Sequence, residues 1–270
     1  MKNFTRHIGR ALNIYSNSTV KPVLLVTGSS GIAAATARMW AAADNPVFVV
    51  GINRDECCTL ASELADADFA VADVRDEAAV RDAVAACVKR FGSLHALFNV
   101  AGISARSVGD APLHACTTEA WDTAMDVNAK GTFLMCREVL AHWTKNTQGG
   151  VILNMGSVTA RHPQRDYFAT AAYAASKGAI ETMSVSAAAY YAPCGIRVNV
   201  IAPGLVRTPM SVRAQANQEI MQYMTEKQPL TKGILSAEDV AKTACFLLGN
   251  NSSPITGQIV AVDGGWAVSG

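Results

Sequence analysis

The sequence predicts an α/β fold: one parallel, doubly wound sheet with helices packed on both of its faces. Short apolar runs alternate with longer amphipathic stretches from residue 21 to the end of the chain. Most of these runs are apolar throughout, as strands that are buried on both faces are. No linker, internal repeat or change in composition divides the 270 residues. We therefore expect one domain over residues 21–270, preceded by an extension over residues 1–20.

The elements of this domain can be placed in chain order. Apolar runs predict seven strands, at residues 23–28, 47–51, 67–74, 96–102, 151–157, 197–204 and 258–265. Amphipathic stretches predict helices at residues 32–43, 77–92, 118–127, 130–145 and 171–191. A last helix is expected to begin near Ser236, because the segment SAED resembles a capping box.

The composition excludes several classes of partner. There are 23 basic and 22 acidic residues, which give a net charge of +1 and no field that would recruit nucleic acid or an anionic membrane. No run approaches the ~20 apolar residues of a membrane span. Seven scattered cysteines, without C-x-x-C pairs, indicate reduced, buried thiols in a cytoplasmic protein and no metal site. Residues 1–20 are basic but lack the apolar core of a secretory signal, so an organellar transit peptide is the alternative to a simple extension.

The loop after the first strand has the composition of a phosphate-binding turn. The segment TGSSGIA (27–33) lies where a strand ends and a helix begins, so its small residues let the backbone approach a pyrophosphate at a helix N-terminus. An ordinary tight turn would have the same residues. Asp73, whose carboxylate can accept from an adenine amino group, and the small residues at 99–102 also end strands. Ligands of open parallel sheets bind at these carboxyl ends, which favours a dinucleotide.

A tyrosine and a lysine are predicted to share one helix face. Tyr173 and Lys177 are four residues apart in YAASK. A free phenol has a pKa of about 10, and a neighbouring ammonium is expected to lower the pKa of Tyr173 toward the range of a general base. A surface contact between the two residues is the simpler alternative. Ser157 ends the fifth strand, where its hydroxyl can donate to a substrate carbonyl, and Asn128 is a polar residue that can hold a water behind the lysine.

Taken in order, these segments resemble those of the short-chain dehydrogenase/reductase (SDR) family. The resemblance runs from about Val23 to Trp266 and rests on TGSSGIA, ADV (72–74), NVAG (99–102), VN (127–128), NMGSV (154–158), YAASK, RVNVIAPG and GQIVAVDGG. It implies a Rossmann-type fold and hydride transfer between NAD(P) and a carbonyl or secondary alcohol. It also implies a homotetramer or homodimer that pairs through the helices near 118–145 and 171–191 and through the C-terminal strand.

The resemblance assigns roles to particular residues. It implies a catalytic set of four residues. Tyr173 exchanges a proton with the substrate oxygen, and Lys177 binds the nicotinamide ribose. Ser157 orients the substrate, and Asn128 supports a proton path. The residues implied to bind the cofactor are Gly28, Ser29, Ser30, Gly31, Ile32, Arg54, Asp73, Val74, Asn99, Ala101, Gly102, Tyr173, Lys177, Pro203, Gly204 and Thr208.

The cofactor loop and the second strand depart from the family pattern. The loop is one residue shorter than usual, because only Ser29 and Ser30 separate its first two glycines, and Ala33 replaces the third glycine. We expect neighbouring residues to absorb the deletion. The second strand ends at Gly51, where NAD-preferring relatives carry an acid, and Arg54 is the nearby base. The cofactor is therefore NADP or NAD, with NADP favoured because the missing acid permits a 2′-phosphate.

The substrate side also departs from the family. The segment between Ser157 and Tyr173 is longer than is common in the family, and the extra length falls in residues 159–172. We expect this segment at the mouth of the site. Its polar side chains either touch the substrate or lie in a solvated loop: His162, Arg165 and Asp166. Residues 205–235 are expected to form a lid whose apolar side chains contact substrate or core: Met210, Met221, Tyr223 and Met224. Two other functions stay open, a catalytically silent dinucleotide-binding protein and a non-redox dehydratase or epimerase that uses the same tyrosine.

Overall fold

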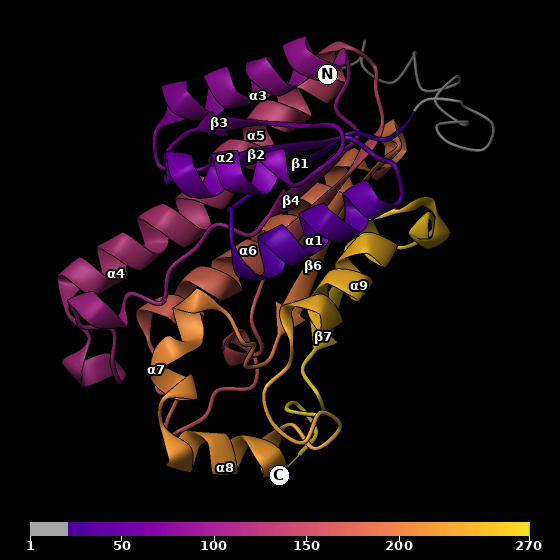
Figure 1. The fold of residues 1–270 in the computed structure, drawn as a ribbon. Helices are drawn as coiled ribbons and strands as arrows, with labels where there is room; N and C mark the ends of the chain where they lie inside the picture. The colour runs from indigo at the N-terminus through magenta and orange to yellow at the C-terminus, as the bar shows by residue number, and fades with distance from the viewer. Residues whose placement is uncertain (1–20, 270) are drawn as a thin grey trace.

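A seven-stranded parallel sheet forms the centre of the computed structural model, which describes residues 21–269 (Figure 1). The spatial order is β3-β2-β1-β4-β5-β6-β7. The strands are β1 Leu24–Thr27, β2 Val47–Gly51, β3 Ala67–Val71, β4 Ala96–Asn99, β5 Gly150–Met155, β6 Ile196–Pro203 and β7 Ile259–Val262. All seven predicted strands are confirmed. The predicted extension over residues 1–20 lies outside the described residues.

Helices cover both faces of the sheet, as predicted. On one face lie α1 (Gly31–Ala42), α2 (Arg54–Ser62) and α9 (Ala237–Leu248), and on the other α3 (Glu77–Phe91), α5 (Gly131–Lys145) and α6 (Ala172–Tyr191). Alternate strand residues feed the two cores: Leu24 packs with α1 and α9, and Leu25 with α3 and α5. Each fully buried side chain of this size contributes roughly 1.5–3 kcal/mol, so the two apolar layers hold the fold.

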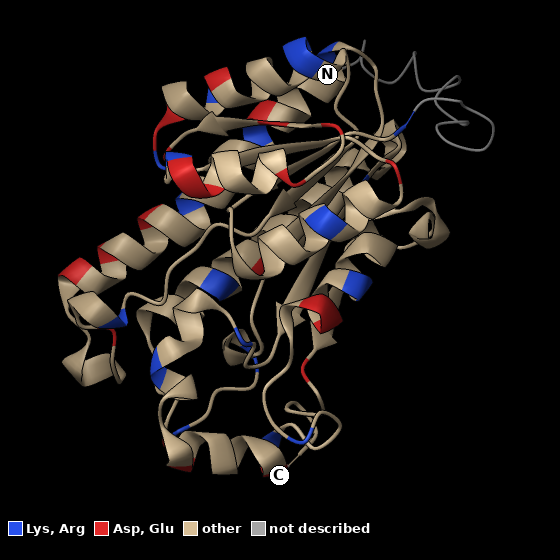
Figure 2. Ribbon diagram, viewed as in Figure 1, with Lys and Arg blue, Asp and Glu red and all other residues tan. Residues whose placement is uncertain are grey.

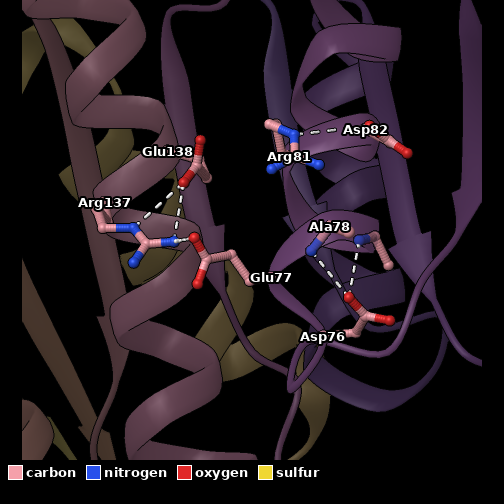
Figure 3. Close-up of polar contacts among 8 residues, drawn as sticks. Asp76, Glu77, Ala78, Arg81, Asp82, Arg137 and Glu138 are labelled. Atoms are coloured by element: carbon pink, nitrogen blue, oxygen red, sulfur yellow. Dashed lines mark hydrogen bonds and ion pairs between the residues drawn. The ribbon is translucent and has the colours of Figure 1, made fainter.

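Polar contacts set the ends of the helices and contribute less. Figure 3 shows Asp76 accepting from the backbone N–H groups of Ala78 and Ala79, which caps α3. In the same view Arg137 of α5 pairs with Glu77 of α3 at 2.7 Å. Such exposed ion pairs are worth about 1 kcal/mol or less. Charged residues lie mainly on the outward faces of the helices (Figure 2).

Three helices were not anticipated individually. Helix α2 begins after Asn53, whose side chain accepts from the N–H groups of Asp55 and Glu56. Asparagine is a preferred N-cap residue, so Asn53 could have predicted where this helix begins. Helices α7 (Val212–Gln215) and α8 (Gln218–Lys227) lie within the predicted lid segment, beyond the carboxyl end of β6.

Helix α4 (Thr118–Ala124) runs into α5 through a π-helical turn, Met125–Lys130. π-Turns inside helices are frequent at functional sites.

All seven cysteines are free thiols, but Cys58 is exposed, so the expectation that they are all buried is wrong. Within residues 21–269, no helix has the length and apolar character that a membrane span requires.

Candidate active site

A cavity of about 670 Å³ opens where β1, β4, β5 and β6 end. The order of the strands reverses between β1 and β4, which is where open α/β sheets bind their ligands. The cavity brings together most of the predicted site residues, namely Gly28, Ser30, Gly31, Ile32, Ala101, Gly102, Ser157, Tyr173, Lys177, Pro203, Gly204 and Thr208.

The shortened glycine loop keeps the backbone geometry that a phosphate group needs. Gly28 (φ +103°) and Gly31 (φ +53°) adopt positive φ angles, which favour glycine. A Cβ on Gly31 would lie 3.0 Å from Cγ2 of Thr208, so the loop passes directly beneath that residue. Ser30 precedes α1 without a side-chain cap, which leaves the first N–H groups of the helix available to an anion. The residues present therefore fit the pyrophosphate of a dinucleotide.

Tyr173 and Lys177 lie on the wall of this cavity, one turn apart on α6. Nζ of Lys177 lies 5.5 Å from the centroid of the Tyr173 ring and donates to the carbonyl oxygen of Met155 at 2.9 Å. Ser157 follows β5, where its hydroxyl acts on the phenol of Tyr173 and hydrogen-bonds with Oγ1 of Thr159 at 2.9 Å. Three groups that can exchange or donate protons thus converge at one point.

Burial dominates the protonation of this pair. It raises the pKa of the Tyr173 phenol above its ordinary value, although the hydrogen bond with Ser157 acts in the opposite direction. Burial also lowers the pKa of Lys177 to about 8. The net shift of the Tyr173 pKa is therefore upward, opposite to the direction expected beside an ammonium, because burial is its largest cause. At neutral pH the phenol is protonated and can act as an acid.

Asn128 supports the site from behind rather than lining the cavity. It is fully buried in the π-helical turn. Its Oδ1 accepts from the N–H of Ile103 at 2.8 Å, and its Nδ2 donates to the carbonyl of Ile103 at 3.0 Å and to Oγ of Ser176 at 2.9 Å. The amide therefore ties the loop after β4 to α6. The water site behind Lys177 stays a prediction.

Several residues predicted to bind the cofactor lie outside the cavity lining, namely Ser29, Arg54, Asp73, Val74 and Asn99. Asn99 is buried and donates to Oδ1 of Asn154 at 2.8 Å, and Val74 packs in the core. The other three lie nearer the surface. Asp73 pairs with Arg75 at 2.6 Å, and Arg54 lies over the ring of Phe69 at 5.9 Å.

Asp110 is the functional residue that the sequence did not reveal. Its carboxylate is 4% exposed and accepts from the N–H groups of Ala171, Ala172 and Tyr173 at 2.9–3.0 Å, and from the hydroxyl of Thr170. Burial opposes ionisation of Asp110, but these hydrogen bonds outweigh it and hold its pKa below the ordinary value. Asp110 therefore caps α6 from about sixty residues away and fixes the turn that carries Tyr173.

The outer wall of the cavity comes from the lid, from residues 161–171 and from the C-terminal segment after β7. Phe168, Met210 and Trp266 line it, and the rings of Phe168 and Trp266 pack 5.1 Å apart. Of the other predicted lid contacts, Met224 is buried and Tyr223 packs against Tyr167, so both are core residues, and Met221 does not line the cavity. The predicted loop residues lie exposed and outside the cavity lining: His162, Arg165 and Asp166.

Comparison with known proteins places the chain in a family. The family model that matches residues 26–267 is described as enoyl-(acyl carrier protein) reductase. The 2-(R)-hydroxypropyl-CoM dehydrogenase of Xanthobacter autotrophicus is 37% identical over 198 residues, which cover 72% of this chain and 76% of that protein. The cis-4-hydroxycyclohexanecarboxylate dehydrogenase of Sinomonas cyclohexanicum is 34% identical over 249 residues, covering 90% of this chain and 96% of that protein.

A solved structure of a reductase has the same fold as this chain. The 3-ketoacyl-(acyl-carrier-protein) reductase from Brucella melitensis, complexed with NADH, superposes with a TM-score of 0.81 at 30% identity and covers 93% of this chain and 100% of that one. The fold and site thus define a Rossmann-type oxidoreductase that uses a nicotinamide dinucleotide. The chain belongs to the short-chain dehydrogenase/reductase family.

Proposed function

We propose that this protein interconverts a small ketone and its secondary alcohol, with Tyr173 as the residue that exchanges a proton with the substrate oxygen. The convergence of Tyr173, Ser157 and Lys177 on a cavity that begins at the glycine loop carries this proposal. The bound nicotinamide supplies or accepts the hydride. The hydroxyl of Ser157 orients the substrate oxygen through a hydrogen bond. The phenol of Tyr173, which burial keeps protonated, donates its proton to that oxygen during reduction and takes it back during oxidation.

Lys177 has two parts in this scheme. Its ammonium lies over the Tyr173 ring, where it stabilises the negative charge that the phenol acquires after it has donated its proton. It also lines the cavity next to Gly102, on which a Cβ would lie 3.6 Å from Nζ, so it is placed to bind the ribose hydroxyls of the dinucleotide.

The position of Glu56 favours NAD over NADP. Gly51 supplies no acid at the end of β2, which was the reason to favour NADP. In the fold, however, Oγ of Ser29 in the glycine loop donates to Oε2 of Glu56 at 2.7 Å, and a Cβ on Gly51 would lie 3.6 Å from that same Oγ. Ser29 thus links the glycine loop to a carboxylate near the end of β2, and in our proposal Glu56 accepts from the ribose hydroxyls and repels a 2′-phosphate. We propose a preference for NAD on this basis.

Exposed apolar side chains lie on the helices expected to pair, with Trp121 on α4, Phe133 on α5 and Val185 and Tyr190 on α6, which supports a homodimer or homotetramer. Light scattering of the purified protein measures that state. The free cysteines support a cytoplasmic location.

The proposed activity is tested by following absorbance of the reduced cofactor. NADH and NADPH are each mixed with sugars, oxosteroids, 3-oxoacyl thioesters and simple ketones, and oxidation of the cofactor is recorded. We expect consumption with at least one ketone. A silent binding protein would bind NADH without consuming it, and a dehydratase or epimerase would convert substrate without net change in absorbance. Failure of both NADH and NADPH to bind at millimolar concentration would contradict both the redox function and the silent dinucleotide-binding function.

A further inference from the structure

Two arginines line the substrate side of the cavity. Arg106 lies in the connection between β4 and α4, and Arg213 lies on α7, whose basic segment can be followed in Figure 2. Nη2 of Arg106 donates to the carbonyl oxygen of Ala169 at 2.9 Å, and Nη2 of Arg213 donates to that of Tyr167 at 3.3 Å. The two guanidinium groups, from distant parts of the chain, thus meet at the same short stretch ahead of Tyr173.

Neither arginine has an acidic partner in residues 21–269, since none of the ion pairs there includes Arg106 or Arg213. The nearby Arg161, by contrast, is paired with the buried Glu181 at 2.6 Å. Asp110 is the acid that acts on Arg106, but its oxygens already accept four hydrogen bonds from Thr170 and the start of α6. Each guanidinium has five donors, so both have N–H groups left for a ligand.

The two cations disfavour each other in this place. Burial, and then the charge of Arg213, lower the pKa of Arg106 below its ordinary value. Arg106 is half-buried and Arg213 is exposed, so solvent screens part of this repulsion, and an anion bound between them would offset the rest. The neighbouring wall is apolar, with Phe168, Met210 and Trp266. The same cavity therefore offers a cationic end, an apolar wall and the proton-transfer groups.

We propose that the substrate is an oxo acid, or the matching hydroxy acid, whose carboxylate is bound by Arg106 and Arg213. The carbon skeleton then packs against Phe168 and Trp266, and the oxo group reaches Ser157 and Tyr173. Guanidinium groups bind carboxylates through paired, charge-assisted hydrogen bonds, which give direction as well as affinity. The inference rests on the proposed redox function of the same cavity and adds the chemical class of the substrate.

Matched pairs of substrates test the proposal. With NADH, kcat/KM is measured for 4-oxocyclohexanecarboxylate and 4-oxopentanoate and for the methyl ester of each. We expect each acid to exceed its ester by about tenfold or more, and Arg106→Gln and Arg213→Gln to lower kcat/KM for the acids by about 10- to 100-fold, mainly through KM. The esters and the Kd for NADH should change less than twofold. Arg106→Lys should recover part of the loss, and Arg165→Gln, an exposed arginine outside the cavity lining, serves as control.

Binding provides a second readout that does not depend on turnover. Cyclohexanecarboxylate should raise the Tm of the NADH-saturated protein, and the double variant Arg106→Gln/Arg213→Gln should abolish that rise while the rise produced by NADH itself persists. Acids and esters that react equally, variants that weaken both alike, or a carboxylate that gives no rise in the wild type would each overturn the inference. Reduction of neutral ketones alone would overturn it and leave the proposed function intact. Absence of NADH and NADPH binding would instead contradict the proposed function.

Discussion

The two ends of the proposed site are built differently: Tyr173 lines the cavity, whereas Ser29 and Glu56 lie outside its lining. Around Tyr173 the supporting polar side chains are buried and bonded to backbone: Asp110 to the start of α6, Asn128 to the loop after β4 and Lys177 to β5. At the other end, Ser29 and Glu56 meet through one exposed side-chain contact. The buried end holds its groups in fixed geometry, so its chemistry should be sensitive to single substitutions. The exposed end sets cofactor choice with few contacts, so its selectivity should change by smaller, adjustable amounts.

The largest effect is expected at the buried end, from Tyr173→Phe. Removing the hydroxyl removes the acid that protonates the substrate oxygen, so kcat should fall by about 10²–10⁴-fold. The Kd for NADH, measured by fluorescence titration, should stay within about twofold because Lys177 and the glycine loop are unchanged. Tyr167→Phe, at a tyrosine that packs against Tyr223 outside the cavity lining, is the matched control. Equal turnover of Tyr173→Phe and the wild type would refute the role of Tyr173.

Asp110→Ala tests whether the capping contact positions Tyr173. The substitution leaves three N–H groups at the start of α6 without their acceptor. We expect a loss of about 1–3 kcal/mol of stability, seen as a lower Tm, together with a roughly 10- to 100-fold fall in kcat. Asp110→Asn keeps an acceptor oxygen and should recover most of the Tm and part of kcat. A variant with a lower Tm but unchanged kcat and pH profile would show that Asp110 stabilises the fold without positioning Tyr173.

A smaller effect is expected at the exposed end, from Glu56→Gln. Removing the negative charge beside Ser29 should raise the ratio of NADPH to NADH affinity by about tenfold, which corresponds to about 1.4 kcal/mol. Titration of both dinucleotides measures this ratio. Glu63→Gln, in the surface pair with Arg38 at the end of α2, should leave it unchanged. A wild type that prefers NADPH, or a ratio that does not move, would remove Glu56 from the account of selectivity.

The smallest effect is the pH dependence at neutral to mildly alkaline pH. Because the pKa of Lys177 is about 8, its ammonium is present below that pH and is lost above it, while the phenol of Tyr173 stays protonated well beyond. In the reductive direction kcat should therefore decline several-fold between about pH 7 and 9. Lys177→Met should be slower throughout and lack this inflection. A reductive profile that is flat to pH 9.5 in the wild type would contradict the role of the ammonium.

How much could be predicted from the sequence depends on whether the interacting residues are close together in the chain. The strands followed from apolar runs such as residues 23–28, and the pairing of Tyr173 with Lys177 followed from helical spacing. Asp110 could not be found this way, because its contact with α6 joins residues far apart in the chain. The direction of the Tyr173 pKa shift differs from the prediction, because the burial that raises it depends on the folded environment and not on helical spacing. The meeting of Arg106 and Arg213 depends on the same packing.

The central claim is that a hydride passes from the nicotinamide to a carbonyl carbon while Tyr173 protonates the oxygen. The most direct test uses NADH with deuterium in both C4 positions of the nicotinamide and a ketone that the enzyme reduces, and analyses the alcohol by mass spectrometry and NMR. We predict one deuterium on the carbinol carbon for the wild type and almost no deuterated alcohol in the same time for Tyr173→Phe. An alcohol without deuterium at that carbon, or equal labelling by both proteins, would contradict the account.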